Sequence, residues 1–273
     1  MNKTKLIKIC KKALLLAHEA LERAGESGIH EIRDTHVTDI TTEGDMAVSK
    51  QLTDFFKEQA MPAILYSEES GKIPIVKNPQ FTITFDDIDG TDNYYRGRGL
   101  LPHCTVVTMF DSINPLFENA LIAGIIEHNS GHIWHAVRNG GCFLNDRRVH
   151  TSARESLDRR ALVIIDHYAS YKNINKLLEV YEKTWVKDFG SAAFHLAGIS
   201  SGMFDGYISH MQKAHELGAG YLLVKEAGGY MQDLSGNTLD KQRYDFDSKY
   251  SIAAASTEKF GKILLSHLER LTM

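Results

Sequence analysis

The stretch Phe81-Thr-Ile-Thr-Phe-Asp-Asp-Ile-Asp-Gly-Thr-Asp-Asn93 organises the whole chain. Its first five residues alternate aromatic and β-branched side chains, which predicts a buried strand over 81–85. Four acidic residues follow within seven positions, and we expect Asp86 and Asp89 to lie on a turn and to face one point. Carboxylates crowded at the end of an apolar strand repel one another and lose hydration. The cluster therefore indicates a site for cations.

A second strand also ends in acidic residues. The apolar segment Ala63–Tyr66 predicts a short strand that runs into Ser67-Glu68-Glu69. Glu68 can join Asp86 and Asp89 if the two strands are neighbours. Mg²⁺ prefers such oxygen ligands, and two ions about 4 Å apart can hold both the attacking and the leaving oxygen of a phosphoryl transfer. The acids therefore favour Mg²⁺-dependent phosphoryl chemistry.

The composition excludes several classes of partner. The chain has 273 residues, a net charge of −4 and no long basic run, so neither nucleic acid nor an anionic membrane is expected to bind. Its three cysteines are widely spaced, which favours reduced thiols in the cytoplasm over disulfides or a zinc ribbon. The apolar run Ala13–Ala17 is too short for a signal peptide or a membrane span.

The order of periodic segments predicts an α/β (α+β) fold in two parts. Residues 1–150 form an N-terminal α+β subdomain with mostly antiparallel strands and most of the metal ligands. Residues 151–273 form an α/β subdomain that closes the site and contacts substrate. Helical spacing predicts helices over 4–24, 46–57, 173–183, 191–201, 215–227 and from 256 onwards. Strands are predicted over 30–33, 63–66, 81–85, 104–110, 121–127, 131–137, 140–145, 161–166, 205–209, 230–233 and 251–255.

An EF-hand loop is one alternative for the acidic cluster. With Gly90 as the invariant glycine of that loop, Asp87 and Asp89 occupy ligand positions. The first position is then Phe85 and the twelfth is Arg96, a cation where a bidentate glutamate is required. The sequence therefore argues against an EF-hand.

A nucleophilic aspartate is the second alternative. Asp87-Ile-Asp89-Gly-Thr91 after a strand matches the DxDGT loop of haloacid-dehalogenase-like phosphatases. In that interpretation Asp87 is phosphorylated and Asp89 acts as acid and base. The motif usually opens its domain, whereas here two helices and another acidic strand end precede it.

Over nearly its full length the chain resembles the inositol monophosphatase family of Mg²⁺-dependent, lithium-sensitive sugar phosphatases. Five motifs in the family's order carry this resemblance. Asp39–Asp45 resembles the family's DxVTxxD motif, Ser67–Glu69 resembles GEE, and Asp86–Asn93 resembles DPIDGTTN. Gly190–Ala193 resembles GTAA or GSAA, and Glu216–Gly220 with Glu226–Gly229 resembles WDxAAG…EAGG.

The resemblance implies a role for each matching residue. It assigns one metal ion to Glu68, Asp86 and the carbonyl of Ile88, and a second to Asp86, Asp89 and Glu216. Thr91 and Glu68 are implied to orient and activate the attacking water, with Asp45 supporting Thr91. The implied substrate contacts are the amides of Gly90 and Thr91, at a helix start that favours phosphate, and Gly190, Ser191 and Ala192.

The same resemblance implies the fold and the reaction. The fold is a layered αβαβα sandwich, and the assembly is a homodimer. The reaction is hydrolysis of a small phosphate ester, an inositol phosphate or another sugar phosphate, by direct attack of a metal-activated water without a phosphoenzyme. About two or three Mg²⁺ ions take part, and Li⁺ is expected to inhibit.

Several positions depart from the family pattern. The closing motif reads His215-Glu216 in place of Trp-Asp, and Asp87 replaces a proline. Ser209 stands where inositol-hydrolysing members carry a glutamate that contacts the sugar, which argues against inositol as the main substrate. His210 and His215 are expected to lack a partner cluster, so zinc is not favoured. A non-catalytic or weakly active homologue that binds metal and phosphate is the remaining alternative.

Overall fold

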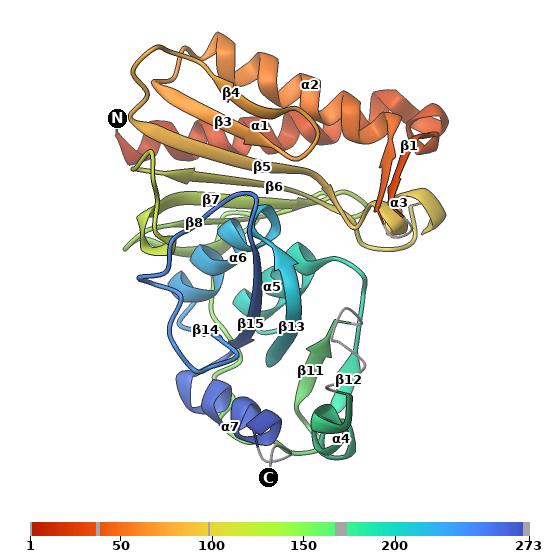
Figure 1. Cartoon of the computed structure of the whole chain (residues 1–273), viewed down its shortest axis with the longest axis vertical. Coiled ribbons are helices and arrows are strands. Elements are labelled where there is room, and N and C mark those ends of the chain that lie inside the picture. Colours follow the sequence, from red (N-terminus) through yellow and green to blue (C-terminus); the bar gives the residue numbers. More distant parts are fainter. Residues whose placement is uncertain (1, 37–38, 98, 167–173, 270–273) are drawn as a thin grey trace.

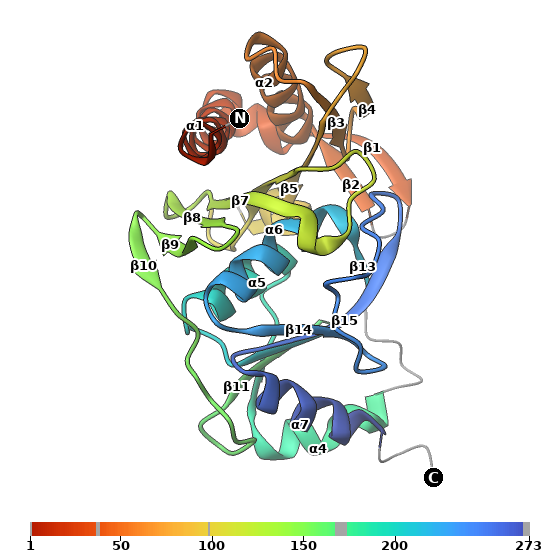
Figure 2. The same ribbon diagram turned by 90° about the vertical axis from the view of Figure 1, so that its left-hand side faces the viewer.

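Helices and sheets alternate in five layers in the computed structural model, which describes residues 2–36, 39–97, 99–166 and 174–269 (Figures 1 and 2). Two helices cover one face of an eight-stranded sheet, and two more separate that sheet from a five-stranded one. A last pair covers the outer face of the second sheet. The predicted αβαβα sandwich is confirmed.

The first layer consists of α1 (Lys3–Ala24) and α2 (Glu43–Glu58). Apolar residues of α1 recur at helical spacing and are buried against the large sheet, and its last turn closes at Gly25. Helix α2 begins three residues before the predicted start, because Thr42 and Asp45 form a capping box. Between the two helices lie η1 (Gly25–Ile29), β1 (Glu31–His36) and β2 (Asp39–Thr42).

The eight-stranded sheet brings the two acidic strand ends together. Its order is β10-β9-β8-β7-β6-β5-β3-β4, and β3 and β5 pair in parallel, with Ser67 opposite Phe85. Parallel strands end at the same edge, so Glu68 lies beside Asp86, as expected. The remaining pairs are antiparallel, which confirms the prediction for this half. The bounds are β3 (Ala63–Ser67), β4 (Gly71–Pro74), β5 (Phe81–Asp89), β6 (Cys104–Phe110), β7 (Ala120–Glu127), β8 (His132–Val137), β9 (Gly141–Leu144) and β10 (Arg147–Val149).

Strand β5 corrects one sequence prediction. The strand does not stop at Phe85 before an acidic turn, but continues to Asp89. Its pairing with β6 shifts register between Asp86 and Asp89, which marks a bulge. Pairing with β6 keeps the acidic segment extended. The sequence pattern of β5 alone could not predict this, because the pairing depends on a different strand. Helix α3 (Thr91–Gly97) follows directly, at the helix start that the resemblance implies for Gly90 and Thr91.

The second half contains a five-stranded sheet of order β12-β11-β13-β15-β14. The predicted helix over 173–183 is found as α4 from Ile174, and residue 173 lies outside the described residues. Short elements with little apolar content, such as β4, β10 and β12, escaped prediction. The bounds are β11 (Leu162–Ile165), α4 (Ile174–Lys183), β12 (Trp185–Lys187), α5 (Ala192–Ser200), β13 (Gly206–Lys213), α6 (Ala214–Glu226), β14 (Tyr230–Asp233), β15 (Lys249–Ala255) and α7 (Glu258–Glu269), with η2 (Phe117–Asn119) upstream.

Three apolar clusters fill the spaces between the layers. One lies between the large sheet and α1 and α2, and another between the small sheet and α4 and α7. The third surrounds α5 and α6 and includes residues of both sheets. The two predicted subdomains therefore share a core, and the division near residue 150 stays a prediction. Within the described residues, no helix has the length and apolarity needed to cross a membrane.

Candidate active site

A cavity of about 370 Å³ opens where β3 and β5 end. Acidic side chains line one wall, and backbone from two glycine turns lines another. Most of the residues that the sequence assigned to metal and substrate are among its lining residues: Glu68, Asp86, Ile88, Asp89, Gly90, Thr91, Gly190, Ala192 and Glu216. The fold therefore gathers positions that are up to 148 residues apart in the chain, from Glu68 to Glu216.

Three buried carboxylates form the floor of this cavity. Asp86 and Asp89 come from β5, and Glu216 comes from the first turn of α6, which packs beneath the same sheet. One oxygen of each lies within 4.8 Å of the others. Glu216, one methylene longer than the aspartate of the family motif, therefore reaches the cluster.

Burial and mutual repulsion disfavour the negative charges of these three carboxylates. Burial, followed by repulsion from Glu68, raises the pKa of Asp86 well above its ordinary value, and burial with repulsion from Asp89 does the same for Glu216. Among the described residues, neither carboxylate oxygen of Asp86 accepts a hydrogen bond, and neither does Oε2 of Glu216. Buried acceptors without donors are costly, and hard oxygen ligands in this number suit a divalent cation.

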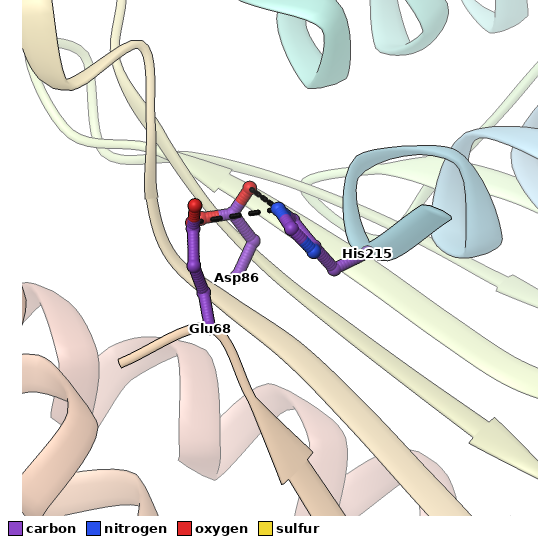
Figure 3. Close-up of side chains that lie close together, drawn as sticks. All are labelled: Glu68, Asp86 and His215. Carbon is purple, nitrogen blue, oxygen red and sulfur yellow. Dashed lines mark ion pairs between the residues drawn. The ribbon is translucent and has the colours of Figure 1, made fainter. Parts of the chain in front are cut away.

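A second group shares Asp86 with the first and is shown in Figure 3. Nε2 of His215 lies 3.4 Å from Oε2 of Glu68 and 3.8 Å from Oδ2 of Asp86. Lys213 Nζ lies 2.6 Å from Oε1 of Glu68. Although burial opposes the change, the positive charges of His215 and Lys213 lower the pKa of Glu68 to about 2. The expectation that His215 lacks a partner cluster is therefore wrong, because that cluster comes from distant strands.

The start of α5 holds Asp89. Ser191 Oγ and the backbone N–H of Ala193 both donate to Oδ2 of Asp89, and Ser191 also caps α5 by accepting from the N–H of Phe194. Burial raises the pKa of Asp89 to about 6, although these hydrogen bonds oppose the rise. Ser191 is buried, is not among the residues that line the cavity, and contacts Asp89. A contact between Ser191 and substrate stays a prediction.

Thr91 lies between a backbone carbonyl and Asp45. Its hydroxyl donates to the carbonyl of Ile88 at 2.8 Å, and Oδ1 of Asp45 lies 3.5 Å from the same hydroxyl. The other carboxylate oxygen of Asp45 accepts from the N–H and the hydroxyl of Thr42. A hydroxyl carries one hydrogen, so Thr91 can donate fully to only one of its two acceptors.

Two glycine turns meet at the cavity. Gly90 and Gly190 both have positive φ, and a Cβ on Gly90 would lie 3.0 Å from the carbonyl oxygen of Gly190. Asn93 fixes the pair of turns, since its side-chain N–H group donates to the carbonyls of Phe189 and Pro102. Close approach of these two backbones therefore requires glycine at position 90.

Asp87 lies outside the cavity. Its carboxylate is fully buried and accepts from Ser67 Oγ at 3.0 Å and from the N–H of Glu69 at 3.3 Å. Burial raises its pKa well above the ordinary value. A nucleophile must reach substrate, so the haloacid-dehalogenase-like role of Asp87 is contradicted. The bulge in β5 directs Asp86 and Asp89, but not Asp87, to the cavity.

Sequence reasoning missed the other end of the cavity. This end is lined by Asp166, Met211, Gln212, Lys213 and Lys249. Ser209 is buried and donates to Oε1 of Gln212. The Tyr207 hydroxyl lies 3.1 Å from this oxygen and 3.1 Å from Oδ2 of Asp166, and it can donate to one of the two. Lys213 directly precedes the helix that carries the closing motif. This adjacency was the one feature of the sequence that could have placed Lys213 at the cavity. Lys249 and Asp166 become neighbours of the site only through the second sheet.

Comparison with known proteins gives a consistent result. The sequence profile of the inositol monophosphatase family matches residues 3–272. The chain is 23% identical, over 82% of both sequences, to the fructose-1,6-bisphosphatase/inositol-1-monophosphatase of Methanothermobacter thermautotrophicus. It is 25% identical to the Nus factor SuhB of Pseudomonas aeruginosa, over 95% of this chain and 94% of that protein. Staphylococcal inositol monophosphatase-1, solved after soaking in LiCl, superimposes with a TM-score of 0.82 at 15% identity, covering 100% of this chain and 97% of that one.

Proposed function

This chain belongs to the inositol monophosphatase family of phosphatases, and on that premise we propose that it hydrolyses a small sugar phosphate with the help of Mg²⁺. One observation carries the proposal. Asp86, Asp89 and Glu216 are buried carboxylates whose oxygens lie within 4.8 Å of one another, at the floor of a cavity large enough for a small ligand.

The residues present fit divalent cations. Asp86, Asp89 and Glu216 would hold one ion, and Glu68, Asp86 and the carbonyl of Ile88 would hold another. When bound, such ions stabilise the charge that develops on the phosphate oxygens and make water a better nucleophile. Ser191 and Ala193 donate to Asp89 from behind and thereby fix the orientation of its carboxylate.

Thr91 and Glu68 would position the attacking water, since both side chains line the cavity. The short hydrogen bond from Thr91 to Ile88 occupies the carbonyl that is proposed as a metal ligand. For that carbonyl to serve, the Thr91 hydroxyl must turn to Asp45, which already lies 3.5 Å away. Asp45 would then accept a hydrogen bond from the hydroxyl, and the Thr91 oxygen could accept a hydrogen bond from water.

The substrate end of the cavity suits a polyhydroxylated ester. Ser209 donates to Oε1 of Gln212, and the Tyr207 hydroxyl lies 3.1 Å from both this oxygen and Oδ2 of Asp166. Both contacts to Gln212 involve its Oε1, which leaves its amide NH₂ group to donate to a sugar oxygen. Ser209 is buried behind Gln212, so it does not replace a glutamate that binds inositol. We therefore rank other sugar phosphates above inositol phosphates. The predicted homodimer stays a prediction, to be measured by light scattering after size-exclusion chromatography.

An ester panel tests the function. The purified, metal-stripped protein is assayed for phosphate release from inositol 1-phosphate, fructose 1,6-bisphosphate, hexose monophosphates and 3′-phosphoadenosine 5′-phosphate, with and without Mg²⁺. We expect turnover of at least one sugar phosphate only with Mg²⁺, and inhibition by Li⁺. Absence of turnover on every ester, in a protein that binds Mg²⁺, would favour the non-catalytic alternative.

A further inference from the structure

His215 is the second residue of α6, next to the proposed ligand Glu216. Glu216 faces the Asp86–Asp89 group, whereas the imidazole of His215 points to the two carboxylates of Glu68 and Asp86 (Figure 3). The family motif has tryptophan at this position, and the indole nitrogen of tryptophan is a donor only. The chain therefore places a potential nitrogen ligand where its family pattern has none.

The imidazole is held in this position by packing. His215 is 5% exposed, and its ring contacts Phe246 with ring centres 5.2 Å apart. Phe246 in turn contacts Tyr66 on β3, the strand that leads to Glu68. The aromatic contacts thus join the helix that carries His215 to the strand that carries its partner. A ring fixed in this way loses little freedom when it binds an ion.

The distances from His215 to the two carboxylates are close to the ligand spacing of a tetrahedral site. Ligand atoms about 2.1 Å from a metal in tetrahedral geometry lie about 3.4 Å from one another. The distances from His215 Nε2 are 3.4 Å to Glu68 and 3.8 Å to Asp86. A further observation points to a cation here, because both oxygens of Asp86, a residue only 1% exposed, accept no hydrogen bond from the described residues.

We propose that Glu68, Asp86 and His215 form a metal site with one nitrogen ligand, which prefers Mn²⁺, Co²⁺ or Zn²⁺ to Mg²⁺. Imidazole binds Zn²⁺ and Co²⁺ well and Mn²⁺ less tightly, whereas Mg²⁺ favours oxygen ligands alone. Lys213 pairs with Oε1 of Glu68 and His215 with Oε2, so the lysine neutralises the glutamate without occupying the oxygen that faces the imidazole. The inference rests on the proposed function in sharing Glu68 and Asp86 with its second ion site, and it can be tested without turnover.

The experiment uses Mn²⁺ as the probe. The metal-stripped protein is loaded with Mn²⁺, and pulsed electron paramagnetic resonance measures coupling to ¹⁴N of a bound imidazole. His215→Phe and His215→Trp remove the ligand and keep an aromatic ring; the tryptophan variant restores the family residue in case the phenylalanine variant fails to fold. His132→Phe on β8 is the matched control, because His132 belongs to neither group of candidate ligands.

We expect ¹⁴N coupling in the wild type and in His132→Phe, and none in the two His215 variants. Mn²⁺ affinity of the coupled site should fall by about tenfold or more, since loss of a ligand costs no less than loss of its supporting hydrogen bonds. Absence of ¹⁴N coupling in the wild type, or coupling that persists in a folded His215 variant, would overturn the inference. Failure of the ester panel leaves this result unchanged, so the two proposals fail separately.

Discussion

Asp86 and Asp89 lie three residues apart on one strand, yet an oxygen of each lies within 4.8 Å of the other. In a regular strand, side chains an odd number of residues apart point to opposite faces. The shift in β5–β6 pairing between these residues provides the extra residue that returns Asp89 to the face of Asp86. Asp87 is left on the other side, buried against Ser67 and Glu69.

This arrangement predicts opposite outcomes for two adjacent substitutions. Asp86→Asn removes the carboxylate shared by both proposed ion sites and should lower kcat/KM by more than about 100-fold, above the loss typical of a ligand's supporting residue. Asp87→Asn should keep most activity, because burial favours a neutral side chain there and asparagine can still accept from Ser67. Steady-state kinetics on the best ester of the panel checks both; an inactive, folded Asp87→Asn would contradict the assignment.

Thr91 provides a second test. Thr91→Val removes the hydroxyl that bonds to Ile88 and faces Asp45, and keeps the shape of the side chain. We expect kcat to fall by about 100-fold, the lower range for loss of a proton-transferring group, with KM little changed. Thr91→Ser is the matched control and should retain most activity. A rise in KM alone, or equal loss of kcat in the serine variant, would argue against a role in orienting water.

Ser191 should link helix capping to metal binding. Ser191→Ala removes both the cap of α5 and the donor to Asp89, so the free energy of unfolding should fall by about 1 kcal/mol. Mg²⁺ affinity, measured by calorimetry, should fall by about tenfold or more because Asp89 loses its support. Asn2→Ala removes the cap of α1 far along the chain and should cost similar stability without weakening Mg²⁺. Equal Mg²⁺ affinity in both variants would show that Ser191 only caps.

The buried carboxyl of Asp45 predicts a pH-dependent difference in stability. Burial raises its pKa from the ordinary 3.8 to about 7, despite hydrogen bonds from Thr42. The native state therefore holds this proton more tightly than the unfolded state, and the contribution of Asp45 to stability falls as pH rises from 3.8 through 7. Relative to the metal-free wild type, Asp45→Asn should gain about 2 kcal/mol between pH 5 and pH 8.

Urea unfolding of both proteins across this range measures the difference, in which the titration of the histidines cancels. A gain that is constant with pH, or that shrinks towards pH 8, would show that Asp45 is already ionised in the native protein at pH 5.

Much of the candidate site followed from local sequence. Two apolar strands ending in acids predicted that Glu68 and Asp86 would meet, and the parallel pairing of β3 with β5 confirmed it. The helix after Gly90 and the helix that carries Glu216 also lie where the motifs indicated. These features depend on hydrophobic periodicity and on short motifs, both of which can be recognised in the sequence without knowledge of tertiary contacts.

Other parts of the site depended on contacts between distant segments. The partners of His215 are 129 and 147 positions upstream, at Asp86 and Glu68, and Ser191 turned out to bind Asp89 rather than to line the cavity. Lys249 reaches the cavity from β15, whose place is fixed by pairing with β13. No spacing rule within the sequence reports such pairings.

The family, the layered fold and the acidic residues that suit cations could be predicted without a structure, because hydrophobic period and motif order are properties of the chain. The folded protein was needed to show which acid faces the cavity, which is buried, and that His215 lies beside Glu68 and Asp86. One bulge reverses the direction in which a side chain points, and a metal site depends on distances of a few ångströms between its ligand atoms. Those distances arise only when strands and helices far apart in the chain pack together.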